Sequence, residues 1–238
     1  MKKPILLAGA NGNIGSFIFE KLNKEYAITR LDYTQGILGN NYFSLDLTNE
    51  LEVSTFSKSS PKHNALIFLV GLAHKKGKGQ EFDEFRRINK QTLVNLLSAL
   101  EVQGKLPNKI IFASTISVYG EKMNQNIYNE DSGKTPFSPY AVTKLEAEQY
   151  LLEQYRDKVW ILRFAPVYAP DFQLNINRRT KSGRWFYKVG NGSKKLSLCN
   201  LENIGSVVEG ILEDKVPPGS YNISDEIEYS YNELLKYV

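Results

Sequence analysis

The stretch AGANGNIG, residues 8–15, decides the fold with which the rest of the sequence must agree. It follows the apolar run PILLA at 4–8, which is typical of a strand buried on both faces. After it, apolar residues recur at helical spacing, at Ile14, Phe17, Ile18 and Leu22. The sequence therefore predicts a strand, a glycine-rich turn and a helix in direct succession, which is the setting of a dinucleotide-binding turn.

The three glycines have different tasks in such a turn. Gly9 allows the tight turn, Gly12 lets the backbone approach a pyrophosphate, and Gly15 permits close packing of helix on strand. The first helical turn also offers unpaired N–H groups and a positive dipole end to phosphates. A plain structural turn can have the same spacing, so the rest of the chain decides between the two. The cofactor-binding positions expected here are Gly9, Asn11, Gly12, Asn13, Ile14 and Gly15.

Strand-like and helical patterns alternate along the chain. Further strands are predicted at 26–31, 42–47, 64–70, 109–114 and 159–164, and helices at 81–101 and 139–155. This alternation predicts an α/β fold with a Rossmann-type, doubly wound parallel sheet. Beyond residue 170 the pattern weakens, and we expect strands at 196–199 and 220–224 and a helix at 203–213, with Asn200 or Asn203 as its N-cap. Residues 1–170 should form the nucleotide-binding domain with the catalytic residues, and 171–238 a shortened substrate lobe that does not fold alone.

The composition is that of an ordinary globular protein. The chain has 238 residues, 42% hydrophobic and 24% charged, with a net charge of +4. Its one cysteine cannot form an intrachain disulfide, and no apolar run is long enough for a membrane span or a signal peptide. We therefore expect a cytoplasmic protein without a membrane partner. The densest basic stretch, HKKGKG at 74–79, predicts a solvated loop rather than nucleic-acid binding, and no residue spacing indicates a metal site.

Two aspartates follow predicted strands. Asp32 lies 23 residues after Gly9, where a carboxylate can accept hydrogen bonds from the adenosine ribose 2′-OH and would repel a 2′-phosphate. This position favours NAD, although the nearby Arg30 keeps NADP open as an alternative. Asp46, after the third strand, either contacts the adenine edge or simply forms a turn.

The catalytic candidates lie in PYAVTK at 139–144 and STISVYG at 114–120. Tyr140 and Lys144 are four residues apart on a predicted helix, so their side chains share a face. A nearby ammonium, helped by the positive charge of a nicotinamide, favours the phenolate and should draw the pKa of the tyrosine toward neutrality, which suits proton exchange with a substrate hydroxyl or carbonyl. Thr115, at a strand end, can bind the same oxygen. The alternatives are a tyrosine that rests on a lysine stem and a threonine that caps a strand.

With these pieces in place, the chain resembles the extended short-chain dehydrogenase/reductase superfamily. The resemblance is to the NAD-dependent epimerase/dehydratase family, whose members act on nucleotide sugars. It covers about residues 4–170, and the matching pieces run in family order: GANGNIG, Asp32, DLT at 46–48, Asn89, STISVYG, PYAVTK and LRFAPVY at 162–168.

The resemblance implies Thr115, Tyr140 and Lys144 as catalytic residues, with Asn89 ordering a water in a proton relay. It implies NAD as cofactor, lined by backbone at 69–72 and 165–167, and a nucleotide-sugar substrate in polysaccharide biosynthesis. It also makes a homodimer possible through the helices at 81–101 and 139–155. The further cofactor contacts expected are Leu47, Val70, Gly71, Lys144 and Pro166, in addition to Asp32 and Asp46.

The sequence departs from the family in three places. Ile116 and Ser117 stand where 4,6-dehydratases carry an Asp-Glu pair, so elimination of water is not expected. Pro166, in PVYAP, has no N–H with which to contact a ligand. Members of the family generally run past about 300 residues, so the substrate lobe should be reduced.

The lobe contains NINRRTKSGRWFYKVGNGSKK at 175–195. Its guanidinium groups match phosphate oxygens, and an aromatic side chain could stack on a base or sugar; the alternative is a basic surface loop. The substrate contacts expected are Thr115, Ser117, Tyr140, Arg178 and Arg179. The sequence thus predicts a nucleotide-sugar 4-epimerase or 4-ketoreductase. A non-catalytic NAD(P)-binding sensor on the same fold is the rival interpretation.

Overall fold

A parallel sheet forms the centre of the molecule. The computed structural model describes residues 2–34, 41–73, 82–120 and 127–236. In this part of the chain seven strands are ordered β12-β6-β5-β4-β1-β2-β3, and every neighbouring pair is parallel. Their bounds are β1 (Pro4–Ala8), β2 (Ala27–Asp32), β3 (Tyr42–Ser44), β4 (Ala65–Phe68), β5 (Lys109–Thr115), β6 (Val159–Phe164) and β12 (Gly219–Ile223). The predicted doubly wound α/β class is confirmed.

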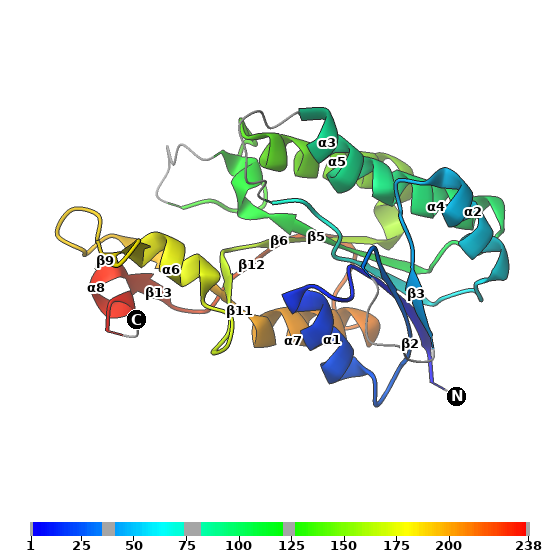
Figure 1. Cartoon of the computed structure of the whole chain (residues 1–238), viewed down its shortest axis with the longest axis horizontal. Helices are drawn as coiled ribbons and strands as arrows, with labels where there is room; N and C mark the ends of the chain where they lie inside the picture. The colour runs from blue at the N-terminus through cyan, green and yellow to red at the C-terminus, as the bar shows by residue number, and fades with distance from the viewer. Residues whose placement is uncertain (1, 35–40, 74–81, 121–126, 237–238) are drawn as a thin grey trace.

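Helices cover both faces of this sheet (Figure 1). One face packs against α1 (Asn13–Leu22) and α7 (Leu201–Leu212). The other packs against α2 (Glu50–Ser59), α4 (Thr92–Val102) and α5 (Pro139–Tyr155). The strand order reverses between β1 and β4, and ligands of open α/β sheets bind outside the carboxyl ends of the strands at such a point. The glycine turn follows β1 at this place.

The helix predicted at 81–101 is interrupted. Residue 81 and the basic stretch at 74–79 lie outside the described residues. From residue 82 the chain forms α3 (Phe82–Arg86), a π-helical segment at Arg87–Gln91, and then α4. A wider π turn inserts one extra residue per turn and re-aims the side chains on it, and Asn89 lies in this turn.

Helix α2 was not predicted from the sequence, which indicated only the strands at 42–47 and 64–70 on either side of it. Its N-cap Asn49 accepts hydrogen bonds from the N–H groups of Leu51 and Glu52. Only Val53, Phe56 and Ser57 of α2 are buried, so its apolar stripe is narrow. The strands at 42–47 and 64–70 are correspondingly shorter in the structure, at Tyr42–Ser44 and Ala65–Phe68.

Residues after 170 contribute to two regions. Strand β12 extends the central sheet, and α7 begins at residue 201 with Asn200 as its N-cap. The remaining segments form a small lobe around Ile176, Leu198 and Leu234. The expected strand at 196–199 is divided between two pairings, because β10 joins β13 and β11 joins β7. The lobe elements are β7 (Val167–Tyr168), α6 (Leu174–Thr180), β8 (Lys181–Ser182), β9 (Trp185–Phe186), β10 (Lys195–Ser197), β11 (Cys199–Asn200), β13 (Glu228–Ser230) and α8 (Tyr231–Leu234). A domain boundary at residue 170 stays a prediction.

No helix in the described part of the chain combines the length and the apolar character that a membrane crossing requires.

Candidate active site

The glycine turn has the geometry that a dinucleotide requires. Gly9 has φ +82°, and a Cβ there would lie 3.0 Å from the backbone of Leu69 and of Val70. A Cβ on Gly15 would lie 2.2 Å from the carbonyl oxygen of Gly9, so this helix approaches the turn as closely as only glycine allows. Gly12, the N-cap of α1, has an ordinary φ of −70° and a Cβ there would meet only Gly9 O, at 3.5 Å. The turn thus fits a pyrophosphate at the N-terminus of α1.

Asp32 ends β2 directly beside this turn. Its carboxylate accepts hydrogen bonds from the backbone N–H of Asn11 (2.9 Å) and of Thr34 (3.2 Å). Arg30 lies with its guanidinium 4.1 Å from the centre of the Phe19 ring and 5.4 Å from that of Tyr42. The carboxylate is therefore fixed next to the glycine turn, while the neighbouring cation is held against two aromatic rings.

Asp46 has the contacts of a turn-forming residue. Its Oδ1 accepts hydrogen bonds from the N–H and the hydroxyl of Thr48, both at 2.8 Å, and its own N–H donates to Glu52. Leu47 is buried, and its carbonyl accepts a hydrogen bond from Asn95. Contacts of Asp46 and Leu47 with adenine stay predictions.

Thr115 and Tyr140 meet at the carboxyl end of β5. Thr115 is the last residue of β5 and the N-cap of a short 3₁₀ helix at Ile116–Tyr119, where its hydroxyl accepts from Ser117 N (3.2 Å). Tyr140 is on the first turn of α5, which Ser138 caps and Pro139 begins. The Thr115 side chain lies near enough to the Tyr140 phenol to act on its pKa, which it tends to lower. A substrate oxygen between them would contact both.

Lys144 is buried one turn further along α5. Its ammonium donates to the backbone oxygens of Ala113 (2.9 Å) and Val70 (3.2 Å) and lies 4.7 Å from the centre of the Phe112 ring. A Cβ on Gly71 would lie 3.0 Å from this nitrogen. Lys144 therefore joins the ends of β4 and β5, at the edge where the glycine turn also lies.

Burial controls the protonation of both side chains. It raises the pKa of Tyr140 above the usual value, against the effect of the Thr115 side chain. It lowers the pKa of Lys144 to about 7, although the charge of Glu148 acts to raise it. In the protein without ligands desolvation dominates at the phenol, because the ammonium of Lys144 faces the carbonyls of Ala113 and Val70. A lower pKa of Tyr140 beside a bound nicotinamide stays a prediction.

Asn89 connects three segments of the site. Its Oδ1 accepts from Leu72 N (2.7 Å), and its Nδ2 donates to Leu72 O (3.2 Å) and to the Thr143 hydroxyl (3.0 Å). The side chain is fully buried, and both amide hydrogens are used within the protein. This arrangement fixes the backbone after β4 against α5. The ordering of a relay water by Asn89 stays a prediction.

The model of the NAD dependent epimerase/dehydratase family matches residues 5–224. The chain belongs to this family. The family is described as NAD dependent, in agreement with the cofactor that the position of Asp32 predicts.

Relatives with different activities share this family. An Escherichia coli O157:H7 N-acetyl-α-D-glucosaminyl-diphospho-ditrans,octacis-undecaprenol 4-epimerase is 25% identical over 99% of this chain and 71% of the relative. A Bacillus subtilis protein, the uncharacterized UDP-glucose epimerase YtcB, is 33% identical over 70% of this chain and 57% of the relative. A mouse dTDP-D-glucose 4,6-dehydratase is 27% identical over 98% of this chain. The solved UDP-glucose 4-epimerase of Thermotoga maritima matches 98% of this chain and 80% of its own, with 24% identity and a TM-score of 0.78.

The sequence interpretation did not identify one buried pair of charged residues beside the site. Glu148 lies one turn after Lys144 on α5 and is bound by Arg163 of β6 through contacts of 2.8–3.2 Å, with both side chains at most 2% exposed. Arg163 also donates to the Tyr119 hydroxyl, and Ser114 donates to Glu148. The signal was available: an arginine inside the continuous apolar strand VWILRF requires a buried partner.

The other predicted positions differ in how they relate to this centre. Pro166 accepts a hydrogen bond from Cys199 N, and Ser117 contacts the Thr115 hydroxyl at 3.3 Å. Arg178 is exposed on α6, and Arg179 donates to Asn175 O of the same helix. The hydrogen bonds and ion pairs recorded for the described residues do not join either arginine to the catalytic side chains. Their role in substrate binding stays a prediction.

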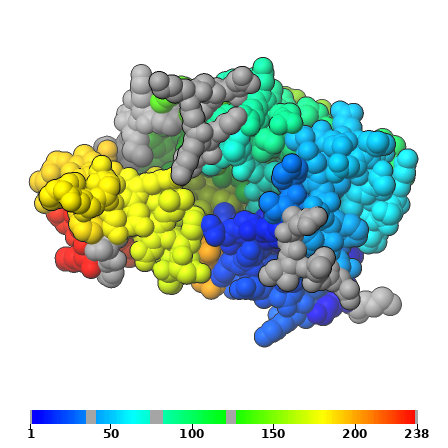
Figure 2. Space-filling view, in the orientation of Figure 1, coloured from blue at the N-terminus to red at the C-terminus, as the bar shows by residue number. Residues whose placement is uncertain are grey.

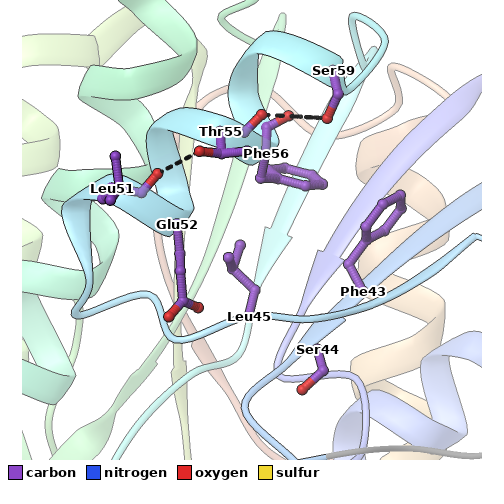
Figure 3. A pocket seen from close by; sticks show the side chains of 8 residues that line it. All are labelled: Phe43, Ser44, Leu45, Leu51, Glu52, Thr55, Phe56 and Ser59. Carbon is purple, nitrogen blue, oxygen red and sulfur yellow. Dashed lines mark hydrogen bonds between the residues drawn. The ribbon is translucent and has the colours of Figure 1, made fainter.

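A shallow pocket between β3 and α2 lies outside the site (Figure 3). It is bordered by Phe43 and Phe56, whose ring centres are 5.3 Å apart, and by Leu45 and Leu51. Glu52, at its edge, is engaged by Asp46 N and Asn49. The pocket contains none of the predicted site residues.

Proposed function

We propose that this chain is an NAD-dependent 4-epimerase or 4-ketoreductase of a nucleoside-diphosphate sugar. The observation that carries the proposal is that Thr115, at the end of β5, and Tyr140 and Lys144, on α5, meet at the edge of the sheet where the glycine turn also lies. NAD, when bound, supplies hydride acceptor and donor chemistry at sugar C4. The residues that would hold it are those of the glycine turn, with Asp32 at the adenosine ribose and Lys144 at the nicotinamide ribose.

The protein groups have distinct tasks in this proposal. Tyr140 exchanges a proton with the oxygen on sugar C4, and Thr115 orients that oxygen. Burial keeps the phenol protonated in the absence of ligands, so the lowering of its pKa must come with the positive charge of the bound nicotinamide and with the ammonium of Lys144. Ile116 and Ser117, in the 3₁₀ helix after Thr115, bring no carboxylate, which argues against a 4,6-dehydratase.

Replacement of the proton-exchanging hydroxyl tests this function. Tyr140→Phe should lower turnover by about 10²–10⁴-fold, the contribution of a positioned acid–base group, and leave NAD affinity nearly unchanged. Purified protein is incubated with a panel of sugar nucleotides, with absorbance measured at the reduced-nicotinamide band and products analysed by chromatography. The product analysis is needed because an epimerase regenerates its cofactor. Full activity of Tyr140→Phe would refute the assignment, and absence of turnover with every substrate would favour a non-catalytic sensor.

A second candidate substrate is a sugar carried on a polyprenyl diphosphate. The E. coli relative is named for such a substrate, and the lobe of this chain exposes aromatic and basic side chains together. Including an undecaprenyl-diphosphate sugar in the same panel distinguishes the two carriers. Assembly as a homodimer through α5 and the α3–α4 segment, and a cytoplasmic location, also remain proposals; light scattering on the purified protein tests the first.

A further inference from the structure

Residues 172–201 of the lobe carry positive charge without negative charge. This segment contains no aspartate or glutamate between Asp171 and Glu202. Its seven cations are Arg178, Arg179, Lys181, Arg184, Lys188, Lys194 and Lys195. In a chain whose overall net charge is only +4, this is a strong local concentration. The segment is therefore attractive to an extended anionic surface.

The middle of this segment also exposes large aromatic side chains. Strands β8 and β9 form a hairpin with a two-residue turn, in which Gly183 has φ +59°. All nine residues at 182–190 are exposed. Trp185 is 69% exposed and Phe186 55%. We name residues 181–188 the basic-aromatic hairpin.

The cations of this hairpin are not neutralised within the lobe. The guanidinium of Arg184 lies 5.3 Å from the centre of the Trp185 ring, and the ammonium of Lys181 lies 5.2 Å from that of Phe186. Lys188 donates to the side-chain oxygen of Asn232. Among the described residues, none of the seven cations forms an ion pair with a carboxylate.

The neighbouring elements of the lobe also carry carboxylates, among them Asp225, which accepts hydrogen bonds from Tyr168, Tyr229, Asn200 and Asn203. Glu226 and Glu228 are exposed before and on β13. Glu233 on α8 is engaged in a capping box with Ser230. The hairpin itself projects at one end of the longest axis of the molecule, while α2 lies toward the other end (Figure 1). In the space-filling view the yellow and orange residues of the lobe form this end (Figure 2).

We propose that the basic-aromatic hairpin docks the protein on an anionic lipid bilayer, in contrast to the expectation from the sequence that there is no membrane partner. Indole and phenyl rings partition into the region between headgroups and acyl chains, and lysine and arginine beside them bind lipid phosphates. Both kinds of side chain are present here on adjacent residues of one projecting turn. The alternation of cations and aromatic rings favours a bilayer over a single nucleotide, which would use one stacked ring and one diphosphate contact.

Vesicle binding tests the proposal. The full chain is sedimented with vesicles of phosphatidylcholine alone or with roughly one-third phosphatidylglycerol, at salt from about 0.05 to 0.5 M. We expect binding only with the anionic lipid and loss of binding at high salt. The chain has two tryptophans, of which Trp160 is 5% exposed, so a blue shift of emission on vesicle addition reports Trp185.

Matched variants identify the surface that binds. Arg184→Glu/Lys188→Glu should weaken partitioning by at least about 30-fold, and Trp185→Ser/Phe186→Ser by about tenfold or more. The controls are Lys58→Glu/Lys62→Glu, which reverses two exposed lysines in and after α2, and Val102→Ser, which removes an apolar side chain 80% exposed on α4. These should bind as the wild type does.

Three results would overturn the proposal. The first is the absence of binding to anionic vesicles at low salt. The second is equal binding by the hairpin variants and the wild type. The third is a blue shift caused by free UDP, or by self-association that Trp185→Ser/Phe186→Ser abolishes, without vesicle binding; these would assign the hairpin to a nucleotide or to a second copy of the chain.

Discussion

Glu148 and Arg163 place two opposite charges in the interior, one turn along α5 from the candidate site residue Lys144. Their contacts satisfy both groups, because Arg163 also donates to Tyr119 and Glu148 also accepts from Ser114. Removal of one partner leaves a buried charge without compensation, whereas replacement of both by apolar groups is often tolerated. The pair therefore matters more for what its disruption costs than for its net contribution to stability.

This asymmetry gives a prediction on stability. Glu148→Gln should lower the free energy of unfolding by about 3–5 kcal/mol, and the double variant Glu148→Leu/Arg163→Met should recover most of the loss. Urea unfolding followed by circular dichroism measures both. Glu146→Gln is the matched control on the same helix, because it breaks the more exposed pair with Arg86 and should change stability little. Equal effects of Glu148→Gln and Glu146→Gln would contradict the prediction.

The buried ammonium of Lys144 gives a prediction on pH dependence. Its pKa is about 7 in the folded protein and 10.5 in its usual state, so between these values the unfolded chain binds a proton that the folded chain does not. The stability contribution of this site therefore rises with pH across that window. Compared with Lys144→Met, the wild type should gain about 3 kcal/mol between pH 7 and about pH 9.5. Unfolding curves of the two proteins without NAD, at both pH values, measure this difference; parallel pH profiles would refute it.

At the scale of single residues, the sequence predicted which side chains meet but not their electrostatic state. Tyr140, Thr115 and Lys144 could be placed together because a helix repeat and a strand end fix their positions. The direction in which the pKa of Tyr140 shifts could not be predicted, because it depends on how far Lys144 turns toward Ala113 and Val70. Burial and side-chain rotamer are properties of the packed structure, so they cannot be predicted from the spacing of residues along the sequence.

At the scale of elements, glycine has two different roles in the β1–α1 turn, close packing and room for a ligand, and the structure shows which glycine has which role. A methyl group on Gly15 would collide with the backbone of Gly9 and Ala10, at 2.2 and 2.8 Å. A methyl group on Gly12 meets only one atom, at 3.5 Å, in a conformation that alanine adopts readily. Gly15 is thus required by the fold, and Gly12 is required by whatever approaches the helix N-terminus.

The two substitutions should therefore differ in effect. Gly12→Ala should keep the melting temperature within a few degrees and weaken NAD binding by about tenfold or more, because the methyl group points where the pyrophosphate must approach. Gly15→Ala should lower the melting temperature of the protein even without NAD, since the helix must move away from the turn. Thermal unfolding with and without NAD, and a titration of NAD, separate the two. A normal NAD affinity in Gly12→Ala would contradict the placement of the NAD pyrophosphate at this turn.

The elements that sequence patterns predicted are those with a continuous apolar signal. The strands β1, β4, β5 and β6 are buried runs and were predicted within two residues. Helix α2 was missed because its buried stripe is narrow, although the polar cap formed by Asn49 and Glu52 marked its start. The π turn around Asn89 could not be predicted, because its extra residue is accommodated by packing against α5 rather than by a local sequence signal.

At the scale of the whole molecule, a single carboxylate connects the lobe to the central sheet. Asp225 follows β12 and accepts four hydrogen bonds: from the Tyr168 and Tyr229 hydroxyls, from Asn200 N and from the Asn203 side chain, at 2.7–3.0 Å. Burial raises the pKa of both tyrosines, so they remain neutral donors. Asp225 thus joins β7, the start of α7 and β13 at one point, and we expect the position of the lobe to depend on it.

The one cysteine of the chain can report on this connection. Cys199 is fully buried between β7 and Asp225, and burial raises the pKa of its thiol to about 12, so it should react very slowly with a thiol reagent in the wild type. Asp225→Ala should open the lobe locally and increase the rate of thiol modification by about 30-fold, which corresponds to roughly 2 kcal/mol of lost local stability. NAD affinity should change much less than the rate of thiol modification, because the glycine turn and Asp32 follow β1 and β2, and only the predicted contact at Pro166 lies beside Cys199. Glu226→Ala, at the adjacent exposed carboxylate, is the control and should leave the thiol protected. If the thiol of Asp225→Ala stays as protected as that of the control, the lobe is held by its apolar core around Ile176, Leu198 and Leu234 instead.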